Sequence, residues 1–335
     1  MSTGRHWLAL PDIPFDVVNV QWPEYTIPEG ACSDVSREML IESLRALKKS
    51  AVLVATVHNE LPHKDRSVGM TKLYESTYSL CDGFVHMGNE SRRLIEARFP
   101  DQTKDKPSVV IPHGNYAIFG EREDRMVAKS NLGIADQPTA LLIGAIRTPE
   151  ELKLSRRLVD SVIAAGGQVI FAAKLPGVRS GRGKSIRILN RLSEELLNGM
   201  RKFLLERRRY VHCIPAPVPH GEMARVASSA DITLIPRIDT LNSGNVPLAY
   251  TYGSVVCGPD VGNVGEILRE TDNSVFSAGA NRRELQSAVT RAFELASAGQ
   301  GEMNYGIAHS DWDWDLIGSS YVNFFRSLIS AKSSL

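Results

Sequence analysis

Short apolar runs alternate with longer amphipathic stretches along most of the chain. Ten runs have the length and composition of strands, and segments with helical spacing lie between them. The predicted strands are residues 16–22, 51–58, 83–87, 108–112, 139–146, 168–174, 211–216, 232–237, 254–259 and 274–278. Helices are predicted at about 34–49, 68–80, 90–98, 150–165, 186–208, 220–229, 245–252, 263–270 and 281–298. This alternation is typical of α/β units with parallel strands.

The pattern divides into two series of strands. A chain of 335 residues has room for two domains, and the stretch between the two series, 114–138, is polar and free of long apolar runs. We therefore predict an α/β protein with two doubly wound, Rossmann-like domains facing a cleft. The N-terminal domain is expected at 1–125 and the C-terminal domain at 126–305. An amphipathic helix with aromatic residues is expected within 306–335, packing back across both domains.

Composition and charge exclude several classes of protein. The net charge of +1 gives no global argument for nucleic-acid binding, and no run approaches the roughly 20 apolar residues that span a bilayer. The N-terminus lacks a charged start followed by an apolar core, so no secretory signal is expected. Four cysteines lie far apart without a CxxC pair, which favours reduced, structural thiols. We predict a cytoplasmic protein with no nucleic-acid partner.

Polar residues follow the second and fourth predicted strands, and ligands of doubly wound sheets bind beyond the carboxyl ends of strands. His58, Asn59 and His63 follow the second strand. They form either a surface loop or a contact for a sugar hydroxyl or a proton. His113 and Asn115 follow the fourth strand, in either a plain turn or a pair of side chains that point into the cleft.

Basic residues follow the fifth and sixth strands. Arg147 lies just before a helix opened by Thr148 and Pro149, and Lys174 ends the sixth strand. An arginine here offers a fork of donors suited to phosphate, and the alternative is a solvated surface arginine.

The segment GVRSGRGKS, downstream of Lys174, is similar to a phosphate-binding P-loop. That motif needs four residues between its glycines, whereas five separate Gly177 from Gly183. We therefore reject an NTPase. A mobile basic loop that faces an anionic substrate or lipid headgroups is expected instead, with Arg179, Arg182, Lys184 and Arg187.

The segment LNSGNVPLAYTYG, 241–253, lies where a strand passes into a helix. Asn242 or Ser243 can simply cap this helix. Alternatively, Gly244 lets a ligand approach the backbone, where free N–H groups and the helix dipole favour a phosphate. With Arg147 and Lys174 at neighbouring strand ends, the second interpretation describes a nucleotide diphosphate site.

Six segments together resemble the retaining GT-B glycosyltransferases of the large family-four-like group, most of all those that build bacterial exopolysaccharides. The segments are TVHNELPH, CDGFVHMGNESRRLI, VVIPHGNY, LLIGAIR, ADITLIPR and NSGNVPLAYTYGSVVCGPDVGNVGEIL. The resemblance implies a metal-independent hexosyltransferase without a cofactor. Its substrates would be a UDP- or GDP-linked sugar donor and a glycan or lipid-linked acceptor.

The resemblance also implies roles for single residues. Arg147 and Lys174 match the basic pair that holds the donor diphosphate, and 242–245 match the loop whose amides meet the same phosphates. His58 matches a histidine that contacts the donor sugar, and 211–216 match the edge on which the nucleobase stacks. The expected catalytic residues are therefore His58, Arg147 and Lys174, and the expected donor-binding residues are His113, Asn115, Asn242, Ser243, Gly244 and Asn245, with no metal site.

The chain also departs from this pattern. Two glutamates that the family carries eight positions apart, of which the second binds the ribose, fall on Thr240 and Leu248, with Asp239 adjacent to the first. RTPEE has glutamate at a usual basic position, and only about 15 residues precede the first strand, so a shortened N-terminal domain is expected. These departures favour an alternative, a catalytically inactive GT-B protein that binds or acts as a scaffold.

Two further hypotheses follow from the sequence. A sugar-nucleotide epimerase on the same fold needs acid and base carboxylates, for which Asp239 and Glu266 are the candidates. The cations of ESLRALKKS and ESRRLIEARF suit a peripheral contact with the inner face of a membrane, and a solvated helix face is the alternative.

Overall fold

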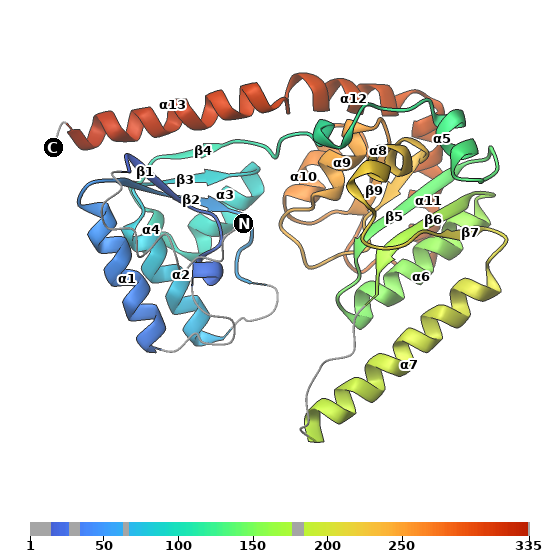
Figure 1. The fold of residues 1–335 in the computed structure, drawn as a ribbon, viewed down its shortest axis with the longest axis horizontal. Coiled ribbons are helices and arrows are strands. Elements are labelled where there is room, and N and C mark those ends of the chain that lie inside the picture. The colour runs from blue at the N-terminus through green and yellow to red at the C-terminus, as the bar shows by residue number, and fades with distance from the viewer. Residues whose placement is uncertain (1–14, 27–33, 63–66, 176–183, 334–335) are drawn as a thin grey trace. The chain divides into compact units, whose positions relative to one another are not determined.

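The computed structural model describes residues 15–26, 34–62, 67–175 and 184–333, with the backbone alone at 184–193. The chain separates into two compact units (Figure 1). Unit 1 comprises Met1–His113 and Trp314–Leu335, and unit 2 comprises Gly114–Asp313. Residues 114–138 therefore belong to unit 2.

Unit 1 contains a four-stranded parallel sheet in the order β1-β2-β3-β4. The strands are β1 (Val17–Val20), β2 (Val52–Val57), β3 (Gly83–His86) and β4 (Ser108–Val110). Its helices are η2 (Pro23–Thr26), α1 (Asp34–Lys48), α2 (Val68–Leu80), α3 (Asn89–Arg98), α4 (Pro100–Thr103) and α13 (Trp314–Ser333). Figure 1 shows α13 on one face of this sheet and α1 and α2 on the other. Ile317 and Leu328 of α13 pack against Val54 and Val85 of the sheet.

Unit 2 contains a six-stranded parallel sheet in the order β10-β9-β8-β5-β6-β7. The strands are β5 (Thr139–Ala145), β6 (Gln168–Lys174), β7 (Val211–Cys213), β8 (Ile232–Leu234), β9 (Val255–Pro259) and β10 (Ser274–Phe276). The chain winds outward from β5 through β6 to β7 and then returns to add β8, β9 and β10 on the other side of β5. The strand order thus reverses between β5 and β8, and ligands of open α/β sheets bind at such a reversal.

Helices cover both faces of the sheet in unit 2. They are η3 (Ala117–Phe119), α5 (Arg125–Asn131), α6 (Pro149–Ala164), α7 (Lys184–Glu206), α8 (His220–Ser228), α9 (Asn245–Thr251), α10 (Gly262–Glu270), α11 (Arg282–Ser297) and α12 (Gln300–Ser310). Successive residues of β5 alternate between the faces: Leu142 packs with α6, α7 and α11, whereas Leu141 and Ile143 pack with α8 and α9. A parallel strand covered on both faces forms a near-continuous apolar run, which explains the segment ALLI.

All ten predicted strands and the nine predicted helices between them are confirmed, and the helix expected within 306–335 is α13. The predicted helices do not include α4, α5 and α12. The segment QGEMNYGIAHS of α12 holds two glycines and no apolar stripe, so its helical structure depends on tertiary packing. Gly301 lies so close to the backbone of Gly253 that a Cβ would meet the Gly253 carbonyl oxygen at 2.3 Å. The buried Asn304 donates to the Ser254 carbonyl at 3.0 Å.

The described cysteines form no disulfide. Cys81 and Cys257 are buried, and burial raises the pKa of each thiol to about 12, whereas Cys213 is exposed. Cys32 lies outside the described residues. None of the described helices has the length and apolar character needed to cross a lipid bilayer.

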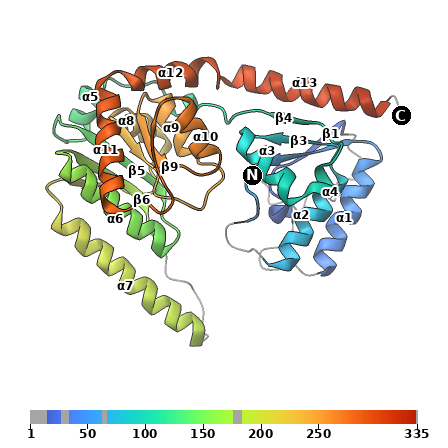
Figure 2. The ribbon, with the colours of Figure 1, turned by 180° about the vertical axis from the view of Figure 1, so that it is seen from behind.

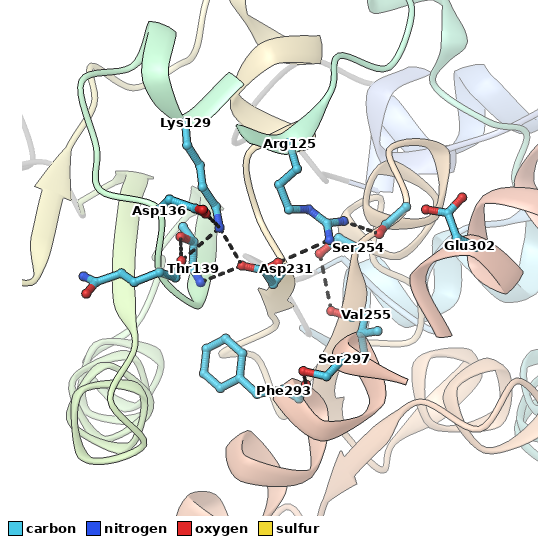
Figure 3. A network of polar contacts seen from close by, with 12 residues as sticks. Arg125, Lys129, Asp136, Thr139, Asp231, Ser254, Val255, Phe293, Ser297 and Glu302 are labelled. Carbon is cyan, nitrogen blue, oxygen red and sulfur yellow. Dashed lines mark hydrogen bonds and ion pairs between the residues drawn. The ribbon is translucent and has the colours of Figure 1, made fainter. Parts of the chain in front are cut away.

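A half-buried carboxylate holds α5 on the amino edge of the sheet in unit 2 (Figure 3). Asp231, which precedes β8, accepts a hydrogen bond from the backbone N–H of Thr139 at 2.8 Å. The same carboxylate accepts from Lys129 Nζ at 3.1 Å and from Arg125 Nη1 at 3.2 Å. The Lys129 side chain is only 5% exposed, so this ion pair offsets part of the cost of burying its ammonium.

We expect Asp231→Ala to lower the free energy of unfolding by about 3 kcal/mol, because the buried Lys129 ammonium then keeps only the Gln137 carbonyl and the more distant, exposed Asp136 carboxylate as partners. Asp136 supplies a matched control, since it lies 3.6 Å from the same Lys129 Nζ but is 62% exposed. Asp136→Ala should therefore cost less than about 1 kcal/mol. Urea denaturation followed by circular dichroism measures both changes, and equal losses would contradict the assigned role of Asp231.

Candidate active site

Two of the predicted basic residues lie side by side at the carboxyl edge of unit 2. Ala145 and Lys174 are paired in register on β5 and β6, and the Ile146 N–H donates to the Lys174 carbonyl at 2.9 Å. Arg147 is the next residue, and the side chains of both Arg147 and Lys174 are exposed. The parallel pairing thus places two cations on adjacent strand ends, as the sequence analysis predicted.

The buried carboxylate of Glu151, in the first turn of α6, fixes the backbone at this edge. Its Oε2 accepts the Arg147 backbone N–H at 2.6 Å, and its Oε1 accepts from Arg237 Nε at 2.8 Å. Arg237 follows β8 and also donates to the Ala145 carbonyl at 2.8 Å. Thr148 caps α6 as predicted, accepting the Glu151 N–H at 3.1 Å. A single carboxylate therefore joins the ends of β5 and β8 on both sides of the strand reversal.

The loop at 242–245 follows β8 at the same reversal. Asn245 Nδ2 donates to the Ile143 carbonyl of β5 at 2.9 Å, and Asn242 Oδ1 accepts from Asn263 Nδ2 at 2.7 Å. These two amide side chains hold the loop in place. The loop therefore offers a ligand its backbone and the Ser243 hydroxyl.

The helix after this loop differs in detail from the prediction. Gly244 is the N-cap residue of α9, and it makes no side-chain cap. Ser243 Oγ instead accepts the Asn245 N–H at 3.4 Å. α9 has seven residues, so its dipole is short and the expected dipole contribution to anion binding is small.

The backbone of Gly244 is exposed and lies against Tyr116. A Cβ at Gly244 would meet the Tyr116 hydroxyl oxygen at 2.8 Å. Across the loop, Gly144 has a φ of +105°, which favours glycine, and it approaches the Asn245 amide. Glycine at these two positions allows the β5 end and the loop to approach each other.

Both polar atoms of the Asn115 side chain form hydrogen bonds with the backbone. Asn115 is buried, and its Nδ2 donates to the Ala308 carbonyl at 3.0 Å while its Oδ1 accepts the Ala117 N–H at 3.2 Å. Its backbone N–H donates to the Trp312 carbonyl at 2.9 Å. These contacts tie the start of unit 2 to α12.

In unit 1, the predicted catalytic residue His58 lies at the carboxyl end of β2. Its ring stacks on Trp22 with centroids 4.0 Å apart, and its Nε2 is 2.6 Å from Gln21 Oε1. Gln21 and Trp22 follow β1, so neighbouring strand ends hold this imidazole. Burial first, and the charge of His113 second, lower the pKa of His58 to about 4. His58 is therefore neutral at pH 7, with Nε2 as the donor to Gln21.

Histidines follow or end three successive strands of unit 1. His86 ends β3, and it is paired in register with Val57 and Val110. It is 1% exposed, and burial first and the Arg92 charge second lower its pKa to about 4. His113 lies edge-on to Trp314, with ring centroids 6.1 Å apart. Since the unfolded chain binds the His58 and His86 protons near pH 6.5, acid weakens unit 1 as the pH falls from about 6.5 towards 4.

No family model matches this sequence, and no curated protein matches it. Solved structures do match. Sucrose-phosphate synthase from Thermosynechococcus elongatus is 14% identical with a TM-score of 0.68, over 97% of this chain and 77% of that one. HepE from Anabaena, solved with UDP and glucose, is 12% identical with a TM-score of 0.67, over 93% and 78%. α,α-Trehalose 6-phosphate synthase from Burkholderia multivorans is 13% identical with a TM-score of 0.66, over 99% and 74%.

The fold is GT-B. At these identities the likeness shows the fold alone, and it confirms the predicted fold class. The positions where the family-four-like GT-B pattern has glutamates are occupied differently in this chain. The Thr240 hydroxyl donates to the Asn242 carbonyl at 2.6 Å, and Leu248 is buried among apolar residues of α8 and α9.

Several residues near the strand ends of the two units received no role from the sequence. In unit 2, Arg237 ends the segment ADITLIPR and Glu151 ends RTPEE, but neither was assigned a function, and Tyr116 follows the turn that holds His113. In unit 1, Gln21 and Trp22 directly follow β1. The rule that strand ends carry sites could have found Gln21 and Trp22. His63, Arg179 and Arg182 lie outside the described residues, as do the side chains of Lys184 and Arg187. Among the described residues, no three His, Cys, Asp or Glu side chains form a group that could hold a metal ion.

We expect His58 to titrate near pH 4, which the ring C–H resonances of the histidines measure by NMR once His58→Gln has assigned the peak. Gln21→Glu should move the midpoint to about 6, because a carboxylate next to Nε2 favours the imidazolium. Gln21→Met has similar size and no charge, so it should leave the midpoint below about 5. A wild-type midpoint at or above 6 would refute the assigned environment of His58.

Proposed function

We propose that this chain is a glycosyltransferase that moves a sugar from a UDP- or GDP-linked donor to a glycan or lipid-linked acceptor. The observation that carries the proposal is the pair Arg147 and Lys174 on adjacent strand ends, next to the loop at 242–245. This group lies at the strand reversal, where α/β sheets bind ligands. Among GT-B proteins of similar structure, HepE was solved with UDP-glucose and with UDP and glucose, which supports a nucleotide-sugar donor.

The proposed chemistry is electrostatic. Arg147, Lys174 and the backbone of 242–245 would neutralise the charge that develops on the leaving diphosphate, with no metal ion required. The bond from the anomeric carbon to the phosphate oxygen breaks while a bond to the acceptor hydroxyl forms on the same face. The hydroxyl proton passes to the leaving phosphate, so the configuration is retained and no protein nucleophile is needed. The transition state would resemble an oxocarbenium ion.

We assign further roles within this proposal. His58, neutral at pH 7, would hydrogen bond to the transferred sugar, and His113 would support it from the end of β4. Asn242 and Asn245 would position the phosphate loop, and Asn115 would hold the start of unit 2. We propose a hexosyltransferase of polysaccharide biosynthesis that acts in the cytoplasm, with a peripheral contact at the inner face of the membrane.

One observation favours a second candidate, an inactive GT-B protein that binds a nucleotide or partner. Thr240 forms a hydrogen bond within the loop, and Leu248 packs in the core. Neither position therefore presents a carboxylate to ribose or sugar. Calorimetry with UDP- and GDP-sugars separates the candidates. Binding without transfer to any acceptor would support the inactive protein, and no binding at millimolar donor would refute both.

Arg147→Ala should lower the rate of nucleotide release from the correct donor by about a hundredfold, since it removes one group that stabilises the leaving diphosphate. A screen of UDP- and GDP-sugars by nucleotide release identifies the donor first. Arg282→Ala, which removes another exposed arginine from α11, should leave the rate unchanged. Release unaffected by Arg147→Ala would contradict the diphosphate role.

Gly244→Ala should weaken nucleotide binding by about tenfold, because its Cβ displaces the loop backbone from the Tyr116 hydroxyl. The φ of Gly244 is −61°, so alanine adds no backbone strain there. Removing the hydroxyl in Gly244→Ala/Tyr116→Phe should restore most of the affinity. Calorimetry measures the three affinities, and an unchanged affinity in the single variant would remove the loop from the site.

A further inference from the structure

The helix α7 lies on the outer side of unit 2, as both Figure 1 and Figure 2 show. One face of its C-terminal half packs on the core: Met200 is fully buried, and Phe203 and Leu204 pack on the same cluster. Arg207 continues this inner face. Its guanidinium stacks on the Phe203 ring at 3.9 Å, and its Nε donates to Asp160 at 2.8 Å.

The opposite side of this helix end is exposed and basic. Leu205 is 69% exposed, and four cations surround it at the spacing of one helix face: Arg201, Lys202, Arg208 and Arg209. We call these five residues the basic face of α7. Helix-like turns carry this face beyond Glu206, since the Arg208 N–H donates to the Leu205 carbonyl at 3.3 Å. Tyr210, 41% exposed, follows directly.

The carboxylates near this face neutralise it only in part. Glu206 lies 4.0 Å from Lys202 and 3.7 Å from Arg207. Glu194 and Glu195 are exposed nearer the start of the helix. Within the described part of the chain, Arg201, Arg208 and Arg209 form no ion pair. The positive charge is therefore concentrated at the end of α7, in a chain whose net charge is only +1.

We propose that the basic face of α7 binds the surface of a bilayer that contains anionic lipids. The cations would contact lipid phosphates, Leu205 would enter the apolar layer, and Tyr210 would lie at headgroup level. The exposed leucine favours a lipid surface over a nucleic acid, because a nucleic-acid backbone offers the leucine no apolar layer to enter. This binding is independent of the sugar chemistry proposed above, so the two proposals can fail separately.

Co-sedimentation with phosphatidylcholine vesicles, with and without 30% phosphatidylglycerol, tests the proposal on the full chain. We expect binding to the anionic vesicles only, and its loss in about 0.5 M salt as the charges are screened. The variant Arg201→Gln/Arg208→Gln/Arg209→Gln should reduce partitioning by about a hundredfold, at roughly fivefold for each cation. Leu205→Ser should weaken binding in low salt by about tenfold.

The matched control is Arg282→Gln/Arg283→Gln/Arg291→Gln, which removes three exposed charges from α11 of the same unit. It should change partitioning less than threefold. An equal loss in the control would show general charge attraction and overturn the proposal, as would no binding to the anionic vesicles. Binding of a 20-nucleotide single-stranded RNA, lost in the α7 variant while vesicles stay unbound, would assign this face to nucleic acid and overturn the proposal as well.

Discussion

The reversal of strand order between β5 and β8 is the constraint on which the candidate site depends. Because β5 and β6 pair in parallel over seven residues, their ends are level, and Arg147 and Lys174 come to the same edge. Because β8 adds on the other side of β5, Arg237 and the loop at 242–245 reach that edge from the opposite direction. These groups come from distant parts of the sequence, and the topology of the sheet brings them together.

Two carboxylates hold the two edges of this sheet: Asp231 at the amino edge and Glu151 at the carboxyl edge. The first stabilises the fold, and the second supports the geometry of the candidate site. Asp231 accepts hydrogen bonds from two cations and a backbone N–H at the amino edge. It stabilises the fold because, without it, Lys129 would be buried without its nearest carboxylate. Glu151 at the carboxyl edge satisfies Arg237 and the Arg147 backbone. Glu151 thus anchors one arginine and holds the backbone of the other while the Arg147 side chain extends from the edge. Binding geometry at such a site needs this kind of support.

Most of the fold could be predicted from the sequence because parallel strands covered on both faces form continuous apolar runs, and ALLI and VIFAA are clear examples. The helix α12 could not, because its glycines and its one buried asparagine, Asn304, depend on contacts with residues distant in sequence, such as Gly301 against Gly253. The residues of the candidate site likewise divide into those that the sequence predicts and those that it does not. Arg147 and Lys174 follow strands and were found by that rule alone, whereas Glu151 and Arg237 owe their position to pairing across the sheet.

The phosphate half of the proposed site and its ribose half are physically separable. Leu248 packs with Ile143 and Tyr252 inside the cluster that joins β5 to α8 and α9, so a carboxylate at 248 would be buried without a partner. The Thr240 hydroxyl donates a hydrogen bond to the Asn242 carbonyl, within the loop that the phosphates would approach. The apolar core therefore occupies one of these two positions, and a hydrogen bond within the loop uses the side chain of the other. The phosphate loop keeps its shape without them, because Asn245 and Asn263 hold it from two other elements. In the proposed site, the ribose would then be bound by other groups, such as the exposed Asp239 after β8.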